Sequence, residues 1–380
     1  MSHRIVVLGA GYAGLSAAKR LSALTDAQIV LVNQREEFVH RVRLHQIATG
    51  QRLPSPPLRQ LLRGTRVQLK IGLVTGIDPE NQLVHLGEAA PLHYDTLLYA
   101  LGSRTGATAA PGVAEHAHTV AELDGALRLR EAVEQADTVA VVGGGLTGAE
   151  TATELAESFP QVKTALFTAG PIGEGLSERG REHVHEVLTR LGVDVHDNTE
   201  VTEVGADGLT VPGGHHPADL VVWSAGFQPP PLAAEAGFTT DRHGRIVVDT
   251  TLRSVSHPQV YAVGDAAAIP GPGGRDLRMA CATAMPSALA AARAIADRLA
   301  GRPARPLRFR YVVQCISLGR REGLVQFVNP DDSPQDRVLR GKAAIAVKEA
   351  ILSGVSAALR RPLLAELSTK AYPRVAERVG

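Results

Sequence analysis

The sequence predicts an α/β protein in which one strand–turn–helix–strand unit occurs twice. In the first copy, an apolar strand at residues 4–8 leads into the glycine turn GAGYAG at residues 9–14, and apolar residues then recur at helical spacing. The same order returns at residues 138–142 (TVAVV) and 143–148 (GGGLTG). The chain has 380 residues, more than one hydrophobic core usually serves, so we expect two or three domains.

Each glycine turn has the composition that a bound dinucleotide requires. The first glycine of a GxGxxG string permits the tight turn, the second lets a pyrophosphate approach the backbone, and the third lets the helix pack closely on the strand. The helix then presents free N–H groups and the positive end of its dipole to the phosphates. Two incidental glycine turns are the alternative. Because both strings lie between a strand and a helix, we favour two dinucleotide sites.

The ends of the second strands bear on which dinucleotide binds. A dinucleotide site usually has an acid here, which accepts hydrogen bonds from the ribose hydroxyls. The first unit instead has Asn33, and the second ends in TAG at residues 168–170. The missing acid removes the repulsion that would reject a 2′-phosphate. Arg179 and Arg181 could pair with that phosphate or lie on a solvated helix surface. The sequence therefore leaves open whether the bound dinucleotide carries a 2′-phosphate.

The rest of the chain predicts shorter elements. Residues 67–95 have the pattern of short strands and turns, and strand-like runs at 309–316 and 324–328 precede a helical stretch at 342–361. One face of that helix carries Ala344, Val347, Ile351, Val355 and Ala358. We expect this face to pack on its own domain, and contact with a membrane surface or a second copy is the alternative.

Composition excludes several classes of function. Lys plus Arg number 40 against 39 Asp plus Glu, and aromatic residues make up 4%, so we expect no nucleic-acid partner. The two cysteines, Cys281 and Cys315, form no CxxC pair, which excludes a disulfide framework and a cysteine-rich metal site. We expect no metal. Because no signal peptide or membrane-spanning run is apparent, we expect the reducing cytoplasm.

Three further motifs accompany the glycine turns and carry a resemblance. They are YDTLLYALGS at residues 94–103, LVVWSAG at residues 220–226 and VYAVGDA at residues 260–266. In this order the motifs resemble those of FAD/NAD(P) oxidoreductases with two dinucleotide-binding domains. GGGLTGAE at residues 143–150 and the WSAG string are most similar to type II NADH dehydrogenases and apoptosis-inducing-factor-like relatives of the pyridine nucleotide-disulfide oxidoreductase superfamily. The resemblance spans about residues 4–330.

The resemblance implies a complete domain plan. The fold class is α/β, with two Rossmann-like three-layer ββα domains of the glutathione reductase kind and a small α+β C-terminal cap. The FAD-binding domain is expected in two pieces, residues 1–108 and 245–305. The NAD(P)-binding domain is expected at residues 109–244, and the cap at residues 306–380.

The resemblance also implies site residues, position by position. The residues expected to bind FAD are Gly9, Gly11, Tyr12, Ala13, Gly14, Asn33, Gln34, Arg35, Arg43, Val74, Ala100, Leu101, Gly102, Gly264, Asp265, Thr283 and Ala284. Those expected to bind NADH or NADPH are Gly143, Gly145, Leu146, Thr147, Gly148, Ala225 and Gly226. Glu150 matches a family glutamate near the nicotinamide, and its alternative role is that of an ordinary acid near a helix N-terminus.

The implied activity is hydride transfer from NAD(P)H to FAD, followed by delivery of electrons to a quinone, an electron carrier or another small molecule. Residues 39–46 (VHRVRLHQ) are more basic than in the family, and we expect them near the flavin ring. There, His40, Arg41, Arg43 and His45 could stabilise reduced flavin or receive an anionic substrate, and a solvated basic loop is the alternative. His45 is the candidate proton donor near neutral pH.

Two departures from the family argue against a membrane quinone reductase. Residues 280–287 (ACATAMPS) lack the family's glutamine-containing quinone signature, and the short C-terminal region lacks aromatic anchors. The alternatives are a peripheral membrane NADH:quinone reductase and a redox sensor that binds both cofactors but turns over slowly. A Cys281–Cys315 pair acting with the flavin, as in sulfide:quinone reductases, is a weaker alternative. We expect a monomer or a homodimer.

Overall fold

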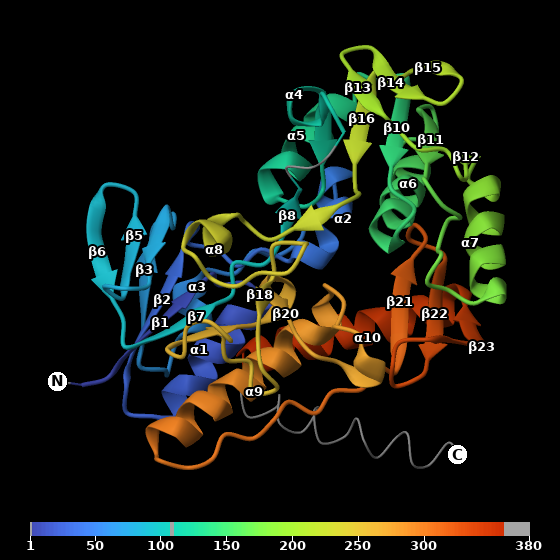
Figure 1. The fold of residues 1–380 in the computed structure, drawn as a ribbon. Coiled ribbons are helices and arrows are strands. Elements are labelled where there is room, and N and C mark those ends of the chain that lie inside the picture. Colours follow the sequence, from blue (N-terminus) through green and yellow to red (C-terminus); the bar gives the residue numbers. More distant parts are fainter. Residues whose placement is uncertain (1, 107–109, 361–380) are drawn as a thin grey trace.

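Two parallel five-stranded sheets, one for each glycine turn, organise the fold (Figure 1). The computed structural model describes residues 2–106 and 110–360. The expected boundary at residues 108 and 109 and the cap residues 361–380 lie outside the described residues. In the first sheet the order is β19-β7-β1-β2-β3, and every neighbouring pair is parallel. Its strands are β1 (Arg4–Leu8), β2 (Gln28–Asn33), β3 (Val67–Ile71), β7 (Thr96–Tyr99) and β19 (Val260–Ala262).

The second sheet repeats this arrangement around the second turn. Its order is β12-β11-β10-β16-β9, again with every pair parallel. The strands are β9 (Ala117–Thr119), β10 (Thr138–Val142), β11 (Lys163–Phe167), β12 (Asp194–His196) and β16 (Leu220–Trp223). In both sheets the central strand is an apolar run, as expected for a parallel sheet covered on both faces. The predicted α/β class with two Rossmann-like units is confirmed.

A small antiparallel sheet follows the third strand of each unit, so the duplication extends beyond the glycine turns. The first comprises β4 (Gly76–Asp78), β5 (Leu83–Leu86) and β6 (Ala89–His93). The second comprises β13 (Glu203–Gly205), β14 (Gly208–Val211) and β15 (Gly214–Pro217). Two short pairs join distant segments: β8 (Arg104–Thr105) with β17 (Phe227–Gln228), and β18 (Ile246–Val247) with β20 (Ala267–Ala268).

The helices pack around these sheets. Helix α1 (Tyr12–Leu24) starts in the first glycine turn and packs on α9 (Cys281–Leu299), and α6 (Leu146–Ser158) starts in the second turn and packs on β10 and β11. The others are α2 (Leu44–Ala48), α3 (Leu58–Leu61), α4 (Val113–His116), α5 (Leu123–Val133), α7 (Glu178–Arg190), α8 (Leu232–Glu235) and α10 (Gly341–Arg360). Short 3-10 turns lie at η1 (Arg41–Arg43), η2 (Gly264–Ala266) and η3 (Pro272–Gly274).

Helix α2 belongs to the first unit by sequence but packs in the core of the second. Its residues Leu44, Ile47 and Ala48 are buried in the same cluster as side chains of α5 and α6, and α2 contacts both of these helices. The basic segment that precedes α2 is therefore held between the two units. This packing brings His45 to the beginning of α6.

The C-terminal part differs from the sequence prediction in one strand. The two expected strands are β21 (Val313–Ser317) and β22 (Gly323–Val328), and a third, β23 (Pro334–Arg340), pairs antiparallel with β22. Residues 309–312, expected to begin the first strand, are not in a strand. The sequence PQDRVLR of β23 escaped prediction because it lies at the sheet edge with no strictly alternating apolar pattern.

The predicted buried face of α10 was partly wrong. The buried residues are Ala344, Lys348, Leu352, Ala358 and Leu359, whereas Val347 is 36% exposed. The apolar stripe is rotated because Lys348 occupies the inner face and holds polar partners there. Within residues 2–106 and 110–360, no helix combines the length and the apolar character needed to cross a membrane.

Candidate active site

The two glycine turns have nearly the same backbone geometry. Gly9 has a φ of +90° and Gly143 one of +131°, a region that side-chain-bearing residues rarely adopt. A Cβ on Gly14 would lie 1.8 Å from the Gly9 carbonyl oxygen, and a Cβ on Gly148 would lie 1.8 Å from that of Gly143. The first and third glycines of each turn are therefore required by the fold itself.

The middle glycines face open space. A Cβ on Gly11 or on Gly145 would meet no other atom within 4 Å. Each is the N-cap of its helix with no side-chain capping bond, and neither α1 nor α6 has an acidic residue in its first turn. Free N–H groups and the positive helix end thus face the space in front of each middle glycine, as a pyrophosphate needs. Both turns fit a dinucleotide.

The polar residues at the strand ends are engaged within the protein. The Asn33 Oδ1 accepts a hydrogen bond of 2.9 Å from the Ala10 N–H, and its Nδ2 donates to the Arg35 carbonyl. Asn33 thereby supports the first turn, and Arg35 pairs with Asp124, while Gln34 is exposed. In the second unit, the Thr168 hydroxyl donates to the Gly170 carbonyl at 3.0 Å. No acid stands at either strand end.

Asp265 lies beside the first turn and is oriented by two side chains. The Ser103 hydroxyl donates to its carboxylate at 2.8 Å, and the Arg41 guanidinium lies 3.7 Å away. Its neighbour Gly264, with a φ of +65°, is packed against Ala13 and Ala284 and donates its N–H to Ser287. The structure thus brings together predicted residues from three distant segments.

Several other predicted positions lie near the carboxyl ends of the strands of the first sheet, where the first glycine turn also lies. The loop of Ala100, Leu101 and Gly102 follows β7, and a Cβ on Gly9 would collide with the Ala100 carbonyl. Thr283 is buried in the first turn of α9, with its hydroxyl bonded to the Arg278 and Ala280 carbonyls. Val74 is buried in the connection after β3.

The segment leading back from the second unit also has the expected turn. The Trp223 indole N–H donates to the Ala225 carbonyl at 3.0 Å, and Gly226 has a φ of +65° with its carbonyl bonded to the Gly106 N–H. This turn directs the chain into β17, where the Arg41 guanidinium lies 5.7 Å from the Phe227 ring centre. Arg41 therefore contacts groups from both units.

Four side chains from four elements meet in a buried cluster at the start of α6. Lys348 of α10 donates to the Glu150 carboxylate and, at 2.8 Å, to the Ser317 hydroxyl of β21. The Ser317 N–H donates to the same Glu150 oxygen at 3.1 Å. His45 of α2 completes the group, with Nδ1 4.0 Å from Glu150 and Nε2 3.4 Å from the Ser317 hydroxyl. We call these four residues the Glu150 cluster.

Burial decides the charge states in this cluster. Burial alone would favour a neutral Glu150 carboxyl, but the Lys348 ammonium, His45 and the hydrogen bonds from Lys348 and Ser317 outweigh it, so the pKa of Glu150 lies below its ordinary value. Burial lowers the pKa of His45 to about 4; the Glu150 carboxylate opposes this shift, and the charges of Lys348 and Arg43 add to it. At neutral pH the cluster holds an ionised carboxylate and a neutral imidazole.

Sequence reasoning identified Glu150 and His45 but missed Ser317 and Lys348. The signal for Lys348 was present, because a single lysine interrupts the apolar spacing of α10 at a position one turn after Ala344 and one turn before Leu352. No pattern marks Ser317, whose role depends on pairing within the C-terminal sheet. His45 is also corrected in one respect, since a pKa of about 4 leaves no protonated imidazole at neutral pH to serve as the donor.

The cysteines show no sign of thiolate chemistry. Both are free and half-buried. Burial raises the pKa of each thiol to about 11, so both are protonated at neutral pH. This finding weakens the hypothesis of a flavin-linked cysteine pair.

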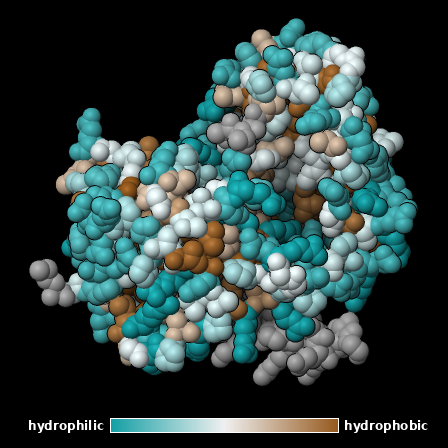
Figure 2. All heavy atoms as spheres, viewed as in Figure 1, coloured by the Kyte–Doolittle hydropathy of each residue, from teal (hydrophilic) through white to brown (hydrophobic). Residues whose placement is uncertain are grey.

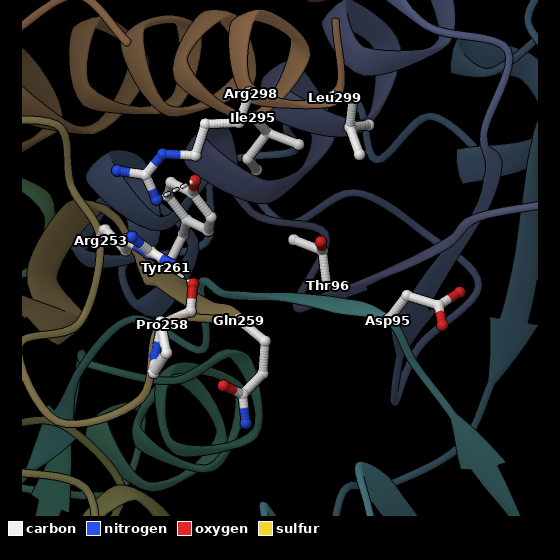
Figure 3. A pocket seen from close by; sticks show the side chains of 9 residues that line it. All are labelled: Asp95, Thr96, Arg253, Pro258, Gln259, Tyr261, Ile295, Arg298 and Leu299. Atoms are coloured by element: carbon white, nitrogen blue, oxygen red, sulfur yellow. Dashed lines mark hydrogen bonds between the residues drawn. The ribbon is translucent and has the colours of Figure 1, made fainter. Parts of the chain in front are cut away.

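The surface has one hollow between the two units and another at the amino end of β7. The face in Figure 2 is hollowed between the part that carries α6 and the part that carries α9 and α10, with hydrophobic atoms at its floor. A hollow of about 280 Å³ lies near β7, β19 and the end of α9, and Figure 3 shows the side chains that line it. There the Arg298 guanidinium donates to the Tyr261 hydroxyl at 2.8 Å and Arg253 to the Pro258 carbonyl. Asp95 and Thr96 place it at the amino end of β7, away from the glycine turns.

Comparison with known proteins accounts for this architecture. The family described as pyridine nucleotide-disulphide oxidoreductase matches residues 3–293. The chain belongs to this family. An NADH dehydrogenase-like protein of Mycobacterium tuberculosis is 31% identical over 347 residues, which cover 83% of this chain and 86% of the relative. A type II NADH:quinone oxidoreductase of the same organism is 32% identical over 319 residues, covering 71% of this chain and 68% of the relative.

Solved structures agree on the fold. The sulfide:quinone oxidoreductase of Aquifex aeolicus superimposes with a TM-score of 0.82 at 21% identity, covering 94% of this chain and 92% of that one. NDH2 of Plasmodium falciparum, in complex with NADH, gives 0.78 at 15% identity, covering 93% and 94%. With the family established, the chain is a flavoprotein oxidoreductase that uses FAD and takes electrons from NAD(P)H.

Proposed function

We propose that this chain is an NAD(P)H:quinone reductase. The overall reaction is NAD(P)H + H⁺ + quinone → NAD(P)⁺ + hydroquinone, which transfers two electrons and takes up one proton beyond the hydride. The observation that carries the proposal is the Glu150 cluster, because a carboxylate, an ammonium and a neutral imidazole in contact with one another form a group that can pass that proton. The names of relatives such as type II NADH:quinone oxidoreductase support the choice of acceptor.

The first turn is proposed to hold FAD, and the second NAD(P)H. The support for FAD is the joint presence of the open space at Gly11 and the Asp265 carboxylate, which can accept hydrogen bonds from a ribityl chain. The support for NAD(P)H is the open space at Gly145, one helical turn before Glu150. When bound, FAD supplies the electron relay between a two-electron hydride donor and the acceptor.

The residues of the Glu150 cluster have distinct proposed tasks. Glu150 orients the carboxamide end of the nicotinamide or accepts a proton, and Lys348 keeps Glu150 ionised until that proton arrives. Ser317 and the neutral His45 connect these charges, since a hydroxyl and a neutral imidazole each donate and accept hydrogen bonds. Arg41 and Ser103 hold the Asp265 carboxylate in place.

Anaerobic stopped-flow mixing tests the proposal in two stages. The FAD-loaded protein is mixed with NADH or NADPH, and the loss of flavin absorbance gives the rate of the first half-reaction. The reduced protein is then mixed with 1,4-naphthoquinone, and we expect flavin absorbance to return at a rate equal to or above the steady-state turnover. Return with a one-electron dye but not with the quinone would instead identify an electron carrier as the acceptor class.

A further inference from the structure

A pocket of about 570 Å³ lies between the second half of α10 and the segment that follows β2. Its walls are mainly apolar, with contributions from Phe38, Leu53, Leu61 and Leu352, and with prolines in the segment after β2. Phe38 and Leu352 are themselves buried. This volume and lining suit a small ring system.

The charged groups that line this pocket are both cations, Arg43 and Arg360. The imidazole of His40 and two serine hydroxyls of α10 also line it, and among the described lining residues none carries a carboxylate; Arg43 has its carboxylate partner, Glu349, outside the lining. The pKa of His40 is lowered, first by its burial and then by the charges of Arg43 and Arg360, which indicates a positive potential inside. An apolar cavity with converging cations is complementary to an apolar ligand that carries an anionic group.

Side chains that line the pocket connect it to the first glycine turn and to the Glu150 cluster. On one side, the Tyr12 hydroxyl of the first glycine turn lies 3.2 Å from the His40 Nδ1, and the Tyr12 and Phe38 rings pack edge to face with centres 5.1 Å apart. On the other side, Arg43 pairs with Glu349, the residue after Lys348 of the Glu150 cluster. A molecule in this pocket therefore contacts side chains that touch the first glycine turn, His40 and Phe38, and one that pairs with the neighbour of Lys348, Arg43.

We propose that this pocket receives the electron acceptor and selects quinones whose ring system carries an anionic group, such as a carboxylate or sulfonate. The inference rests on the proposed quinone reductase function. In this pocket, the quinone ring packs against Phe38 and Leu352, and the anionic group pairs with Arg360 and with Arg43. A neutral quinone of the same ring size packs equally well but leaves these cations without a ligand charge, so it binds more weakly.

Direct binding to the FAD-loaded protein gives the first test. Isothermal titration is carried out with naphthalene-2-sulfonate, which is inert to reduction here, and with the neutral 2-naphthalenemethanol. We expect the sulfonate to bind about tenfold more tightly, a difference that Arg360→Gln removes, since one charge-assisted contact is worth about this factor. Arg321→Gln, which removes an arginine 90% exposed and remote from the pocket lining, is the matched control and should change neither affinity.

Turnover with a matched acceptor pair gives the second test. In Arg360→Gln, KM for 1,4-naphthoquinone-2-sulfonate should rise about tenfold, whereas KM for 1,4-naphthoquinone and the rate of flavin reduction by NAD(P)H should not change. Ser356→Trp, which fills the pocket, should abolish sulfonate binding and leave flavin reduction intact. Equal affinities for the sulfonate and the alcohol, or sulfonate binding that survives Ser356→Trp, would overturn the inference. If the sulfonate binds as expected but no quinone reoxidises the flavin, the proposed function fails and the pocket's anion selectivity stands.

Discussion

The two glycine turns share a backbone geometry but lead into helices that bury charges of opposite sign. In each turn, a Cβ on the third glycine would lie 1.8 Å from the carbonyl oxygen of the first, and the middle glycine faces open space. In α1, the next buried charge is Lys19, which is 2% exposed. In α6, the next charged residue is Glu150, whose side chain is 12% exposed and lies at the centre of a charged cluster.

These two charges have different partners and different roles. The Lys19 ammonium donates to the carbonyls of Leu61 and Leu359 at 2.7 and 2.5 Å, so it ties the last described turn of α10 to the first unit. Glu150 meets a cation and an imidazole instead, in front of the second turn. The helix after the first turn thus carries a charge that holds α10 in place. In our proposal, the helix after the second turn carries a charge that takes part in proton transfer. Substitutions in the two units test this division.

The largest effect is expected from the glycines themselves. Gly148→Ala sets a Cβ against the Gly143 carbonyl and should abolish flavin reduction by NAD(P)H and lower the melting temperature, because the backbone cannot move far enough without a large cost. Gly145→Ala meets no protein atom, so it should fold normally and lose only nicotinamide binding. Gly14→Ala and Gly11→Ala should repeat this contrast for FAD. Equal melting temperatures in either pair would show that the 1.8 Å contact does not govern the fold.

The next effect concerns Glu150. Glu150→Gln removes the carboxylate that Lys348 and Ser317 bind, and quinone turnover should fall by about 10²-fold, the usual contribution of a positioned acid or base. Glu154→Gln is the control: it lies one turn later on α6 and is also buried, but its partners are Gln51 and Arg320. Stopped-flow and steady-state rates measure both. A similar loss in the two variants would mean that the effect comes from burial on α6 rather than from the cluster.

A smaller effect should appear in the pH dependence of stability. The pKa of His45 is about 4 in the folded chain against 6.5 in its ordinary state, so the unfolded chain takes up the proton first as the pH falls. The stability that the neutral His45 contributes is therefore complete above pH 6.5 and is lost as the pH falls toward 4. Between about pH 7 and pH 5 the loss should be about 2 kcal/mol.

Urea unfolding of wild type and His45→Gln at both pH values isolates this contribution, because the other histidines are common to both proteins. The variant should lose less stability on acidification. Parallel curves would show that folding does not lower the pKa of His45, and the imidazole would then be protonated in the folded chain at pH 5.

The smallest effect concerns the strand ends. Ala169 is exposed in the acid-free segment after β11. Ala169→Asp should lower kcat/KM for NADPH about tenfold relative to that for NADH, because the carboxylate repels a 2′-phosphate and accepts bonds from a ribose hydroxyl. Ala169→Asn is the uncharged control. An unchanged ratio would mean that the ribose lies elsewhere.

Local pattern predicted the parts of the molecule that local geometry controls. The glycine turns, the central strands and the helices α1 and α6 could be predicted because a GxGxxG turn requires a strand before it and a helix after it within a few residues. Position-by-position resemblance then predicted Asp265, Ala284 and Glu150, and the structure brings Asp265 and Ala284 to the first turn.

Other features depended on packing that no local pattern records. Edge strand β23 has no clear alternation. The spacing of α10 marks Lys348 as an interruption of the apolar stripe, but it does not show that the ammonium is buried. Burial of that lysine is tolerated only because Glu150 and Ser317 supply its hydrogen bonds. The spacing within α10 could not reveal partners in two other elements.

The sequence by itself determined the two units, their order and the cofactor class, since each depends on contacts between residues close in the chain. Only the tertiary structure decided the composition of the Glu150 cluster, whose members are separated from one another by up to 303 residues. It also decided that His45 is neutral and that cations converge in the pocket beside α10. Burial and charge neighbours are properties of the packed molecule, because desolvation and Coulomb interactions depend on distance in space and not on distance along the chain.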